Sequence, residues 1–199
     1  MAIIVDKVEK RRNIALACKD ILYEHGIKNI TISQISQTAG VGKGTIYEYF
    51  DNKEDIVFEI ITIHISEHLK DLESIMNDSL TIKEKLFYFF YSIYKDEIGQ
   101  QQLKVYREFL AIAMTNGTKD MIDFNLKCRN KFLYILGEII QKGVDDNLIH
   151  EEMHKMKSSM LTFGAGLVVN SHVLGLDPKE EIENFLNNIF NFMKKEEEL

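Results

Sequence analysis

The sequence is poor in proline and cysteine and contains no long apolar run, and each of these shortages excludes something. Its 199 residues include one proline, Pro178, so little interrupts long helices. The two cysteines, Cys18 and Cys128, have neither disulfide nor zinc spacing, which favours a reducing cytosol and no bound metal or cofactor. The longest nearly continuous apolar stretches, 86–94 and 161–169, are too short to span a bilayer.

The first residues, MAIIVDKVEKRRN, lack an apolar core followed by a small-residue cleavage site, so we expect no secretory signal and a cytoplasmic location. The formal net charge of −7 looks unsuited to nucleic acid, but it is unevenly distributed. Residues 1–53 carry eight Lys/Arg against six Asp/Glu, whereas residues 54–199 carry 16 against 25. A mildly basic head permits DNA contact, because only the contacting face must be positive.

Apolar residues recur at helical spacing along the chain, and no strand-period alternation competes with them. Capping boxes at Thr31 to Gln34 and at Thr81 to Glu84 mark two helix starts, and glycines mark several ends. The pattern predicts an all-α fold of nine helices, near 5–25, 32–39, 43–49, 53–77, 81–98, 101–115, 119–142, 151–174 and from 178 onward.

The second and third predicted helices are joined by a tight turn. Gly40 can take the left-handed conformation there, and Val41 can fill the space between the helices. With the small Ser36 before the turn and Ile46 after it, the spacing suits two helices that cross steeply around a small core. Such a helix-turn-helix leaves the outer face of its second helix free to enter the major groove of DNA.

The stretch TISQISQTAGVGKGTIYEYFDNKEDI, Thr31 to Ile56, resembles the N-terminal domain of the TetR family of bacterial transcriptional repressors. The motifs in register are Ala39-Gly40-Val41, Lys43-Gly44, Tyr47-x-Tyr49-Phe50 and Lys53-Glu54. The resemblance is strong over residues 10–60, and beyond them only helix count, length and order agree. It implies a nine-helix TetR-like fold, with a DNA-binding domain at 1–52 and a ligand-sensing and dimerisation domain at 53–199.

The resemblance implies DNA contacts from nine residues: Thr31, Ser33, Gly42, Lys43, Gly44, Thr45, Tyr47, Tyr49 and Lys53. Lys43 suits a phosphate or a guanine edge, and Gly44 lets the backbone approach DNA closely. The two tyrosines would contact phosphates or thymine methyls, and Lys53 would contact a phosphate at a helix N-terminus. Packing is the alternative for both tyrosines, and a solvated surface charge is the alternative for Lys43.

Two positions depart from the family pattern. Gly42 stands where the family usually has serine, so one hydroxyl contact to a phosphate is expected to be missing. Glu48 puts a negative charge on the reading helix, where it can accept from a cytosine amino group, pair with a lysine or point away from the groove. Phe50 we assign to the core.

The long C-terminal part is rich in aromatic residues. Residues 86–94 are apolar on every side of a helix, which indicates a buried helix. An ordinary core is one interpretation, and a concave pocket for a small-molecule effector, as in the family, is the other. For the pocket, the candidate residues are Phe90, Tyr94, Tyr106, Phe109, Phe124, Phe163 and Asn170.

The last two predicted helices carry apolar stripes that suit a four-helix interface across a two-fold axis. Packing within one chain is the alternative. The residues predicted to line the interface of a homodimer are Phe163, Leu167, Leu174, Phe185, Ile189 and Phe190.

A different pattern, His150-Glu151-x-x-His154, fits the H-E-x-x-H motif of zinc hydrolases, in which two histidines on one helical face bind zinc. It lies at an exposed helix start without a third ligand nearby, so we expect an incidental pair. His64 and His68 have the same spacing and are expected to be solvated positions. Three hypotheses follow: a ligand-responsive dimeric repressor, which is not an enzyme; a DNA-binding regulator controlled by a protein partner; and, remotely, a zinc metallohydrolase.

Overall fold

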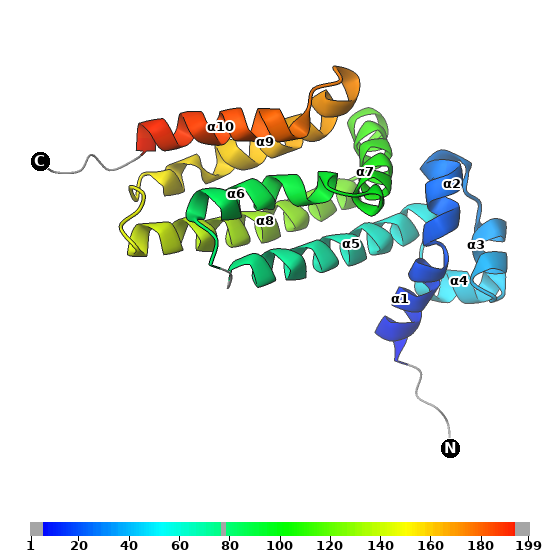
Figure 1. The fold of residues 1–199 in the computed structure, drawn as a ribbon. Coiled ribbons are helices and arrows are strands. Elements are labelled where there is room, and N and C mark those ends of the chain that lie inside the picture. Colours follow the sequence, from blue (N-terminus) through cyan, green and yellow to red (C-terminus); the bar gives the residue numbers. More distant parts are fainter. Residues whose placement is uncertain (1–5, 77–78, 194–199) are drawn as a thin grey trace, which may run out of the picture. The chain divides into compact units, whose positions relative to one another are not determined.

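The computed structural model describes residues 6–76 and 79–193, and every regular element among them is helical (Figure 1). The elements are α1 (Lys7–Ala17), α2 (Lys19–Asn29), α3 (Ile32–Thr38), α4 (Lys43–Tyr49), α5 (Lys53–Met76), α6 (Ile82–Tyr91), the short 3₁₀ helix η1 (Ser92–Tyr94), α7 (Glu97–Asn116), α8 (Lys119–Asp145), α9 (Met153–Val173) and α10 (Pro178–Met193). The all-α prediction is confirmed.

The helix predicted from residue 5 to residue 25 is two helices, which raises the described number from nine to ten. Residue 5 lies outside the described residues. The break falls at Cys18, whose N–H donates to the carbonyls of Ala15 and Leu16. The buried Sγ of Cys18 donates to the Ile35 carbonyl at 3.6 Å. Burial raises the pKa of this thiol to about 11, so Cys18 acts as a neutral core residue.

The described residues fall into two compact units, one within 1–66 and 101–122 and the other within 67–100 and 123–199. Helices α5, α7 and α8 therefore contribute residues to both. The domain boundary predicted at residue 52 coincides with the start of α5 at Lys53. The assignment of separate tasks to 1–52 and 53–199 stays a prediction.

In the first unit, α1 to α4 enclose a small apolar core. Its fully buried side chains include Leu22, Ile35, Ile46 and Phe50. The turn between α3 and α4 has Gly40 at φ 65°, where a residue with a side chain would be strained. These features give the crossing of two short helices that the sequence predicts.

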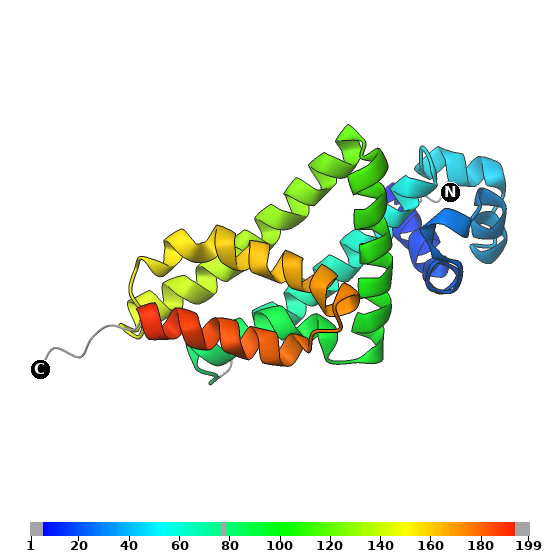
Figure 2. The same ribbon diagram turned by 90° about the horizontal axis from the view of Figure 1, so that it is seen from above.

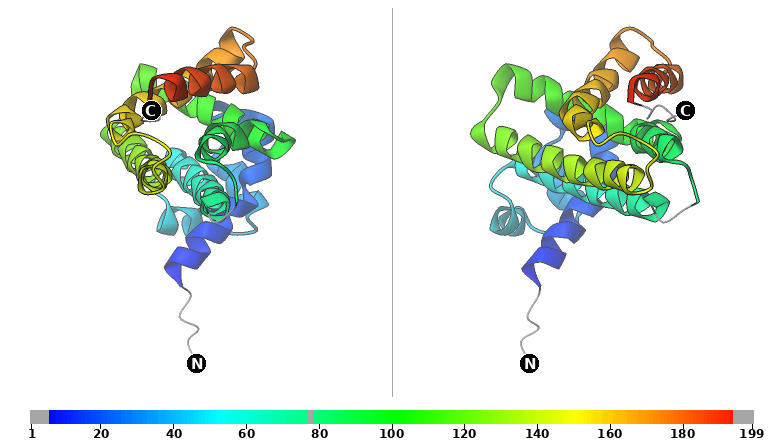
Figure 3. Two further views of the ribbon diagram at one scale, coloured as in Figure 1. Left: turned by 60° about the vertical axis from the view of Figure 1, so that its left-hand side comes forward. Right: turned by 90° about the vertical axis from the view of Figure 1, so that its left-hand side faces the viewer.

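In the second unit, α10 packs on α6 and α9, while α8 runs across the direction of α10 (Figures 2 and 3). Phe163 of α9 and Phe185 of α10 stack face to face, with ring centroids 3.8 Å apart. Phe90 of α6 meets both rings edge-on, at 5.8 and 6.2 Å. This aromatic cluster joins α6 to the consecutive helices α9 and α10, which lie far from it in sequence.

The predicted helix starts are confirmed at atomic detail. Thr31 and Gln34 form a reciprocal capping box at α3, and Thr81 and Glu84 form one at α6. The hydrogen bond from Thr81 lowers the pKa of Glu84. At α5, the Asp55 N–H donates to the Asn52 side chain at 2.8 Å. Among the described residues, no helix is both long and apolar enough to cross a membrane.

Candidate DNA-binding interface

Helix α4 is amphipathic over only seven residues, and its polar side faces solvent. Ile46 is fully buried, whereas Lys43, Gly44 and Glu48 are exposed and the Tyr47 side chain is 59% exposed. A large aromatic residue left this open on a short helix has no packing role in the chain itself. The exposed face of α4 therefore offers a cation and an aromatic hydroxyl to an external partner.

Local hydrogen bonds fix helix α3 and the turn that leads into α4. The Val41 N–H donates to the Ser36 carbonyl at 3.0 Å, and the buried Ser36 hydroxyl donates to the Ser33 carbonyl at 3.0 Å. Thr31 accepts from the Gln34 N–H at 3.3 Å as the N-cap, and both Thr31 and Ser33 are exposed. The two predicted contacts at the start of α3 are thus accessible.

The remaining predicted DNA contacts differ in how accessible they are. Thr45 and Tyr49 are half-buried, and Gly42 is exposed as the N-cap of α4 without a side-chain cap. The Lys53 ammonium donates to the carbonyls of Ile27 and Lys28, each at 3.1 Å. Two of the three N–H donors of this ammonium are thus used within the chain, and the third remains for a phosphate.

Arg11 is a residue of this region that the sequence did not single out. Its guanidinium donates to Asp55 at 2.5 Å, to Glu59 at 2.8 Å and to the carbonyl of Tyr49, the last residue of α4. It also lies 4.3 Å above the centroid of the Phe50 ring. Burial disfavours the charged guanidinium, but its hydrogen bonds to the two carboxylates outweigh this and raise the pKa of Arg11. Arg11 thus fixes the C-terminal end of α4 against α1 and α5.

Residues 16–60 match the profile of bacterial regulatory proteins of the tetR family. A TetR transcription regulator from Haloarcula marismortui ATCC 43049 has the same fold, with a TM-score of 0.75 and 18% identity over 94% of this chain and all of that one. The chain belongs to the TetR family. It is a helix-turn-helix transcriptional regulator by this membership, and α3 and α4 are its helix-turn-helix.

Two further relatives of this TetR-family chain come from Bacillus subtilis. The fatty acid metabolism regulator protein of strain 168 is 26% identical over 165 residues, which cover 79% of this chain and 80% of the relative. The crystal structure of the transcriptional regulator FadR in complex with stearoyl-CoA has a TM-score of 0.65 and 22% identity, over 88% of this chain and 95% of that one. Because the FadR structure is only 22% identical to this chain, its similarity shows a shared fold and nothing more.

The residues predicted to bind an effector are divided between the two units of the TetR-family chain. Tyr106 and Phe109 belong to the first unit, where their rings stack at 6.3 Å. The other five belong to the second unit: Phe90, Tyr94, Phe124, Phe163 and Asn170. The rings of Phe90 and Phe163 touch edge-on at 5.8 Å, and Asn170 is exposed. Their role in binding stays a prediction.

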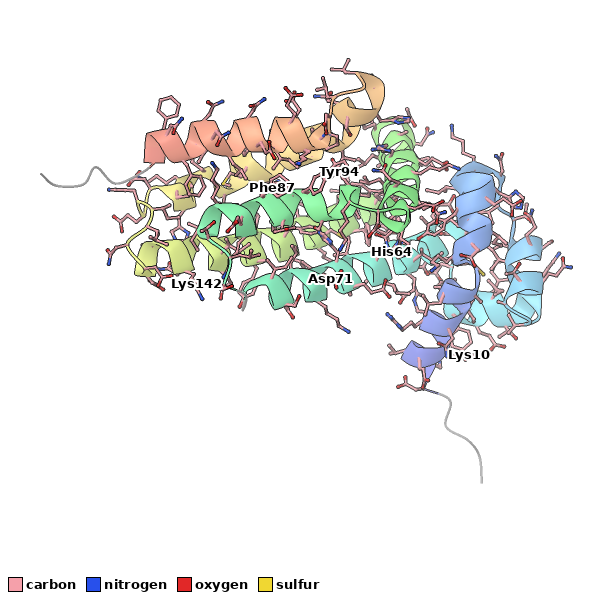
Figure 4. The ribbon with its side chains drawn as sticks, in the orientation of Figure 1. Lys10, His64, Asp71, Phe87, Tyr94 and Lys142 are labelled. Carbon is pink, nitrogen blue, oxygen red and sulfur yellow. The ribbon has the colours of Figure 1, made fainter. Side chains whose placement is uncertain are left out.

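A groove of about 530 Å³ opens between α6 and α10 on the second unit. Its floor includes Phe87, labelled in Figure 4, and Leu186, and its rim carries two lysines and two glutamates. None of the seven predicted effector residues lines it.

The six residues predicted to line the dimer interface differ in exposure. Leu167 and Ile189 are buried within their own unit, and Phe163, Phe185 and Phe190 are half-buried. Leu174 is 64% exposed. Among the described side chains of α9 and α10, Val173 and Phe192 are the most exposed large apolar ones, and sequence reasoning did not name them. The interface stays a prediction.

The zinc hypothesis loses its geometric basis. His150 precedes α9, which begins at Met153, so His150 and His154 do not share a helical face. His150 Nδ1 accepts from the Glu152 N–H at 3.2 Å, and His154 Nε2 lies 3.0 Å from the Gln141 side-chain oxygen. In the described part of the chain, no group of three or more His, Cys, Asp or Glu residues is placed to hold a metal ion.

The expectation that His64 and His68 are solvated was wrong. His64 on α5 (Figure 4) is 8% exposed and shares a hydrogen bond of 2.9 Å with the Tyr23 hydroxyl. Burial, with a smaller effect of Lys19, lowers its pKa to about 4. His68 lies 3.4 Å from the Ser92 hydroxyl, and burial lowers its pKa to about 4 as well. Helix α5 is enclosed on more sides than its mixed sequence indicates.

Proposed function

We propose that this TetR-family regulator is a repressor that binds a palindromic operator as a homodimer and releases it when a small effector binds. The observation that carries the proposal is the exposed face of α4, where Lys43 and Tyr47 stand open beside a buried Ile46. A recognition helix with this pattern suits the major groove of DNA, where lysine reads phosphate or guanine and the tyrosine contacts phosphate or a thymine methyl. The protein would act in the cytoplasm, where operator DNA is accessible.

A homodimer would place two α4 helices one helical turn of DNA apart, about 34–36 Å, and so read two half-sites. Exposed apolar side chains on α9 and α10 support pairing through these helices. Val169 is 38% exposed, Val173 69%, Leu174 64% and Phe192 85%. Apolar area of this kind gains free energy when a second copy removes it from water.

The effector that we propose is a long-chain acyl-CoA. Two relatives support this class, namely the fatty acid metabolism regulator and the FadR complex with stearoyl-CoA. The second unit of this chain is rich in aromatic and aliphatic side chains, and ring contacts link Phe132 to Phe89, Phe89 to Phe90 and Phe90 to Phe163. An interior of this composition suits an apolar tail if the helices part to admit it.

The operator is tested by selection. The wild-type protein is incubated with a pool of random-sequence duplexes, and the bound duplexes are sequenced through successive rounds. We expect an inverted repeat bound by two chains. With roughly three to five phosphate contacts per chain, affinity should fall about 10³-fold or more between 50 and 200 mM salt. Failure to enrich any duplex would overturn the DNA-binding function.

The effector is tested by titrating the selected complex with stearoyl-CoA while fluorescence anisotropy reports bound DNA. Coenzyme A and stearate are the matched controls, because each carries one half of the effector. We expect release with stearoyl-CoA alone, corresponding to about 1–3 kcal/mol of coupling. If the same fraction of the duplex stays bound with all three compounds, this effector class is excluded and the DNA-binding function is unaffected.

A further inference from the structure

The end of α2 has an unusual construction. Gly26 adopts φ 75° and ψ 169°, which interrupts the helix and leaves the next N–H without a helical acceptor. Glu108 of α7 supplies one: the Ile27 N–H donates to its Oε2 at 2.7 Å. A Cβ atom on Gly26 would lie 2.7 Å from that same oxygen, so the carboxylate rests directly over the glycine. The break in α2 and the position of Glu108 thus depend on each other.

Residues 26–31, which connect α2 to α3, form the α2–α3 corner, and other side chains also bind its backbone or that of α2 just before it. The Lys104 ammonium, one helical turn before Glu108 on α7, donates to the Tyr23 carbonyl at 3.1 Å. The Lys53 ammonium of α5 donates to the carbonyls of Ile27 and Lys28. All of these residues belong to the first unit. The backbone groups of the corner are therefore held by side chains from outside the helix-turn-helix.

The corner leads directly into the DNA-reading elements. Ile30 follows as the C-cap of α2 and Thr31 as the N-cap of α3, and α3 packs on α4. Three residues thus lie between Ile27 and Thr31, the N-cap of α3. The position of this N–H against α7 therefore constrains the direction in which the chain enters α3.

We propose that Glu108 is a positioning residue for the helix-turn-helix, which holds the α2–α3 corner at the angle that operator binding requires. The proposal rests on the DNA-binding function proposed above and adds a specific residue of α7 to it. Because α7 begins at Glu97, among residues of the second unit, a displacement along this helix reaches the corner through one continuous element.

The test compares Glu108→Ala with Glu108→Gln. Both variants remove the same negative charge, but only glutamine keeps an oxygen that can accept from the Ile27 N–H. The probe is the duplex selected with the wild-type protein, with a scrambled duplex of equal length for non-specific binding. Anisotropy titrations give both dissociation constants, and a stoichiometric titration gives the active fraction.

We expect Glu108→Ala to weaken binding to the selected duplex on the order of 10-fold relative to Glu108→Gln. Binding to the scrambled duplex and the slope of affinity against salt should agree between the two variants, because neither loses a phosphate contact. A purely structural role would reduce the active fraction and leave the dissociation constant unchanged. Equal dissociation constants for the selected duplex would overturn the proposal.

A second measurement covers the case in which Glu108→Ala does not fold. Hydrogen–deuterium exchange of the wild-type and Glu108→Gln proteins, read on peptides spanning 22–31, should show slow exchange that slows further when the selected duplex binds. Exchange in this segment that does not respond to the duplex would also overturn the proposal. If the wild-type protein selects no duplex at all, the failure lies with the DNA-binding function and not with Glu108.

Discussion

Arg11 connects α1 to the end of the recognition helix through three hydrogen-bonded partners on two other elements. Its side chain is 29% exposed, so the ion pairs with Asp55 and Glu59 are only partly screened by solvent. Both carboxylates are also less than one-quarter exposed. Removing the guanidinium would leave two carboxylates close together without their cation.

We therefore expect Arg11→Ala to lower the free energy of unfolding by about 1–3 kcal/mol. Arg11→Lys should recover only part of this, since an ammonium cannot form the two-pronged bond to Asp55. Thermal unfolding followed by circular dichroism measures both. An alanine variant as stable as the wild type would show that the network contributes nothing.

His64 makes stability depend on pH. Its folded pKa of about 4 lies below the ordinary value of 6.5, because burial disfavours the charged ring. Between these values the unfolded chain binds more protons than the folded one, so stability falls as the pH falls from 6.5 towards 4. One pKa unit corresponds to about 1.4 kcal/mol, so the full effect is roughly 3 kcal/mol.

The expected outcome is a smaller loss of stability between pH 7 and pH 5 in His64→Gln than in the wild type. His68 titrates in both proteins, so its contribution cancels in the comparison. Denaturant unfolding at the two pH values gives the difference. Identical losses in the two proteins would mean that His64 is not protonated on unfolding.

Single residues were the least predictable from the sequence. The exposure of Tyr47 and the burial of Phe50 follow from the helix-turn-helix pattern and agree with it. The carboxylate partners of Arg11 lie 44 and 48 residues away along the chain, and no local sequence pattern indicates them. Lys85, a charged residue that is only 2% exposed, lies on α6 at a position that its charge alone would assign to the surface.

At the scale of elements, capping chemistry gave the most reliable information. Lys43–Tyr49 agrees with the predicted recognition helix at both ends, and α5 begins directly after its predicted cap, Asn52. The first helix was predicted too long because its apolar spacing continues through Cys18. The helical conformation was predicted to end before Gly26, and it does, since Gly26 has φ 75°.

Thr31 provides the test at this scale. Thr31→Ala removes the N-cap of α3 and should lower stability by about 1 kcal/mol, whereas Thr31→Ser keeps the hydroxyl and should lose little. Urea unfolding of the two variants and the wild type measures this. Equal midpoints for alanine and serine would show that the capping box does not stabilise the helix-turn-helix.

At the scale of the whole molecule, helix order and fold class were predictable, because periodicity and glycine positions extend along the chain. The surfaces that α9 and α10 present to a second chain were not, since buried and exposed apolar residues occur on the same helices. The sequence placed Leu167 and Ile189 at an interface, whereas they are only 4% and 7% exposed in a single chain. Packing within one chain and pairing between two chains use the same residue types.

Pairing of two chains is tested on the exposed face of α9. Val173→Glu introduces a charge at a side chain that is 69% exposed, so the single chain should fold normally. We expect this variant to be monomeric by light scattering, with the wild type dimeric. Ser159→Glu, at an exposed position of the same helix, is the matched control and should remain dimeric. A dimeric Val173→Glu protein would move the interface elsewhere.

The central claim is that the open face of α4 contacts duplex DNA, and one titration tests it most directly. Lys43→Ala, Tyr47→Ala and the control Lys142→Ala, an exposed lysine on α8, are titrated against the selected duplex. The account predicts losses of about 1–3 kcal/mol in binding free energy for the two α4 variants, with unchanged unfolding curves and unchanged binding by the control. Wild-type affinity in both α4 variants would contradict it.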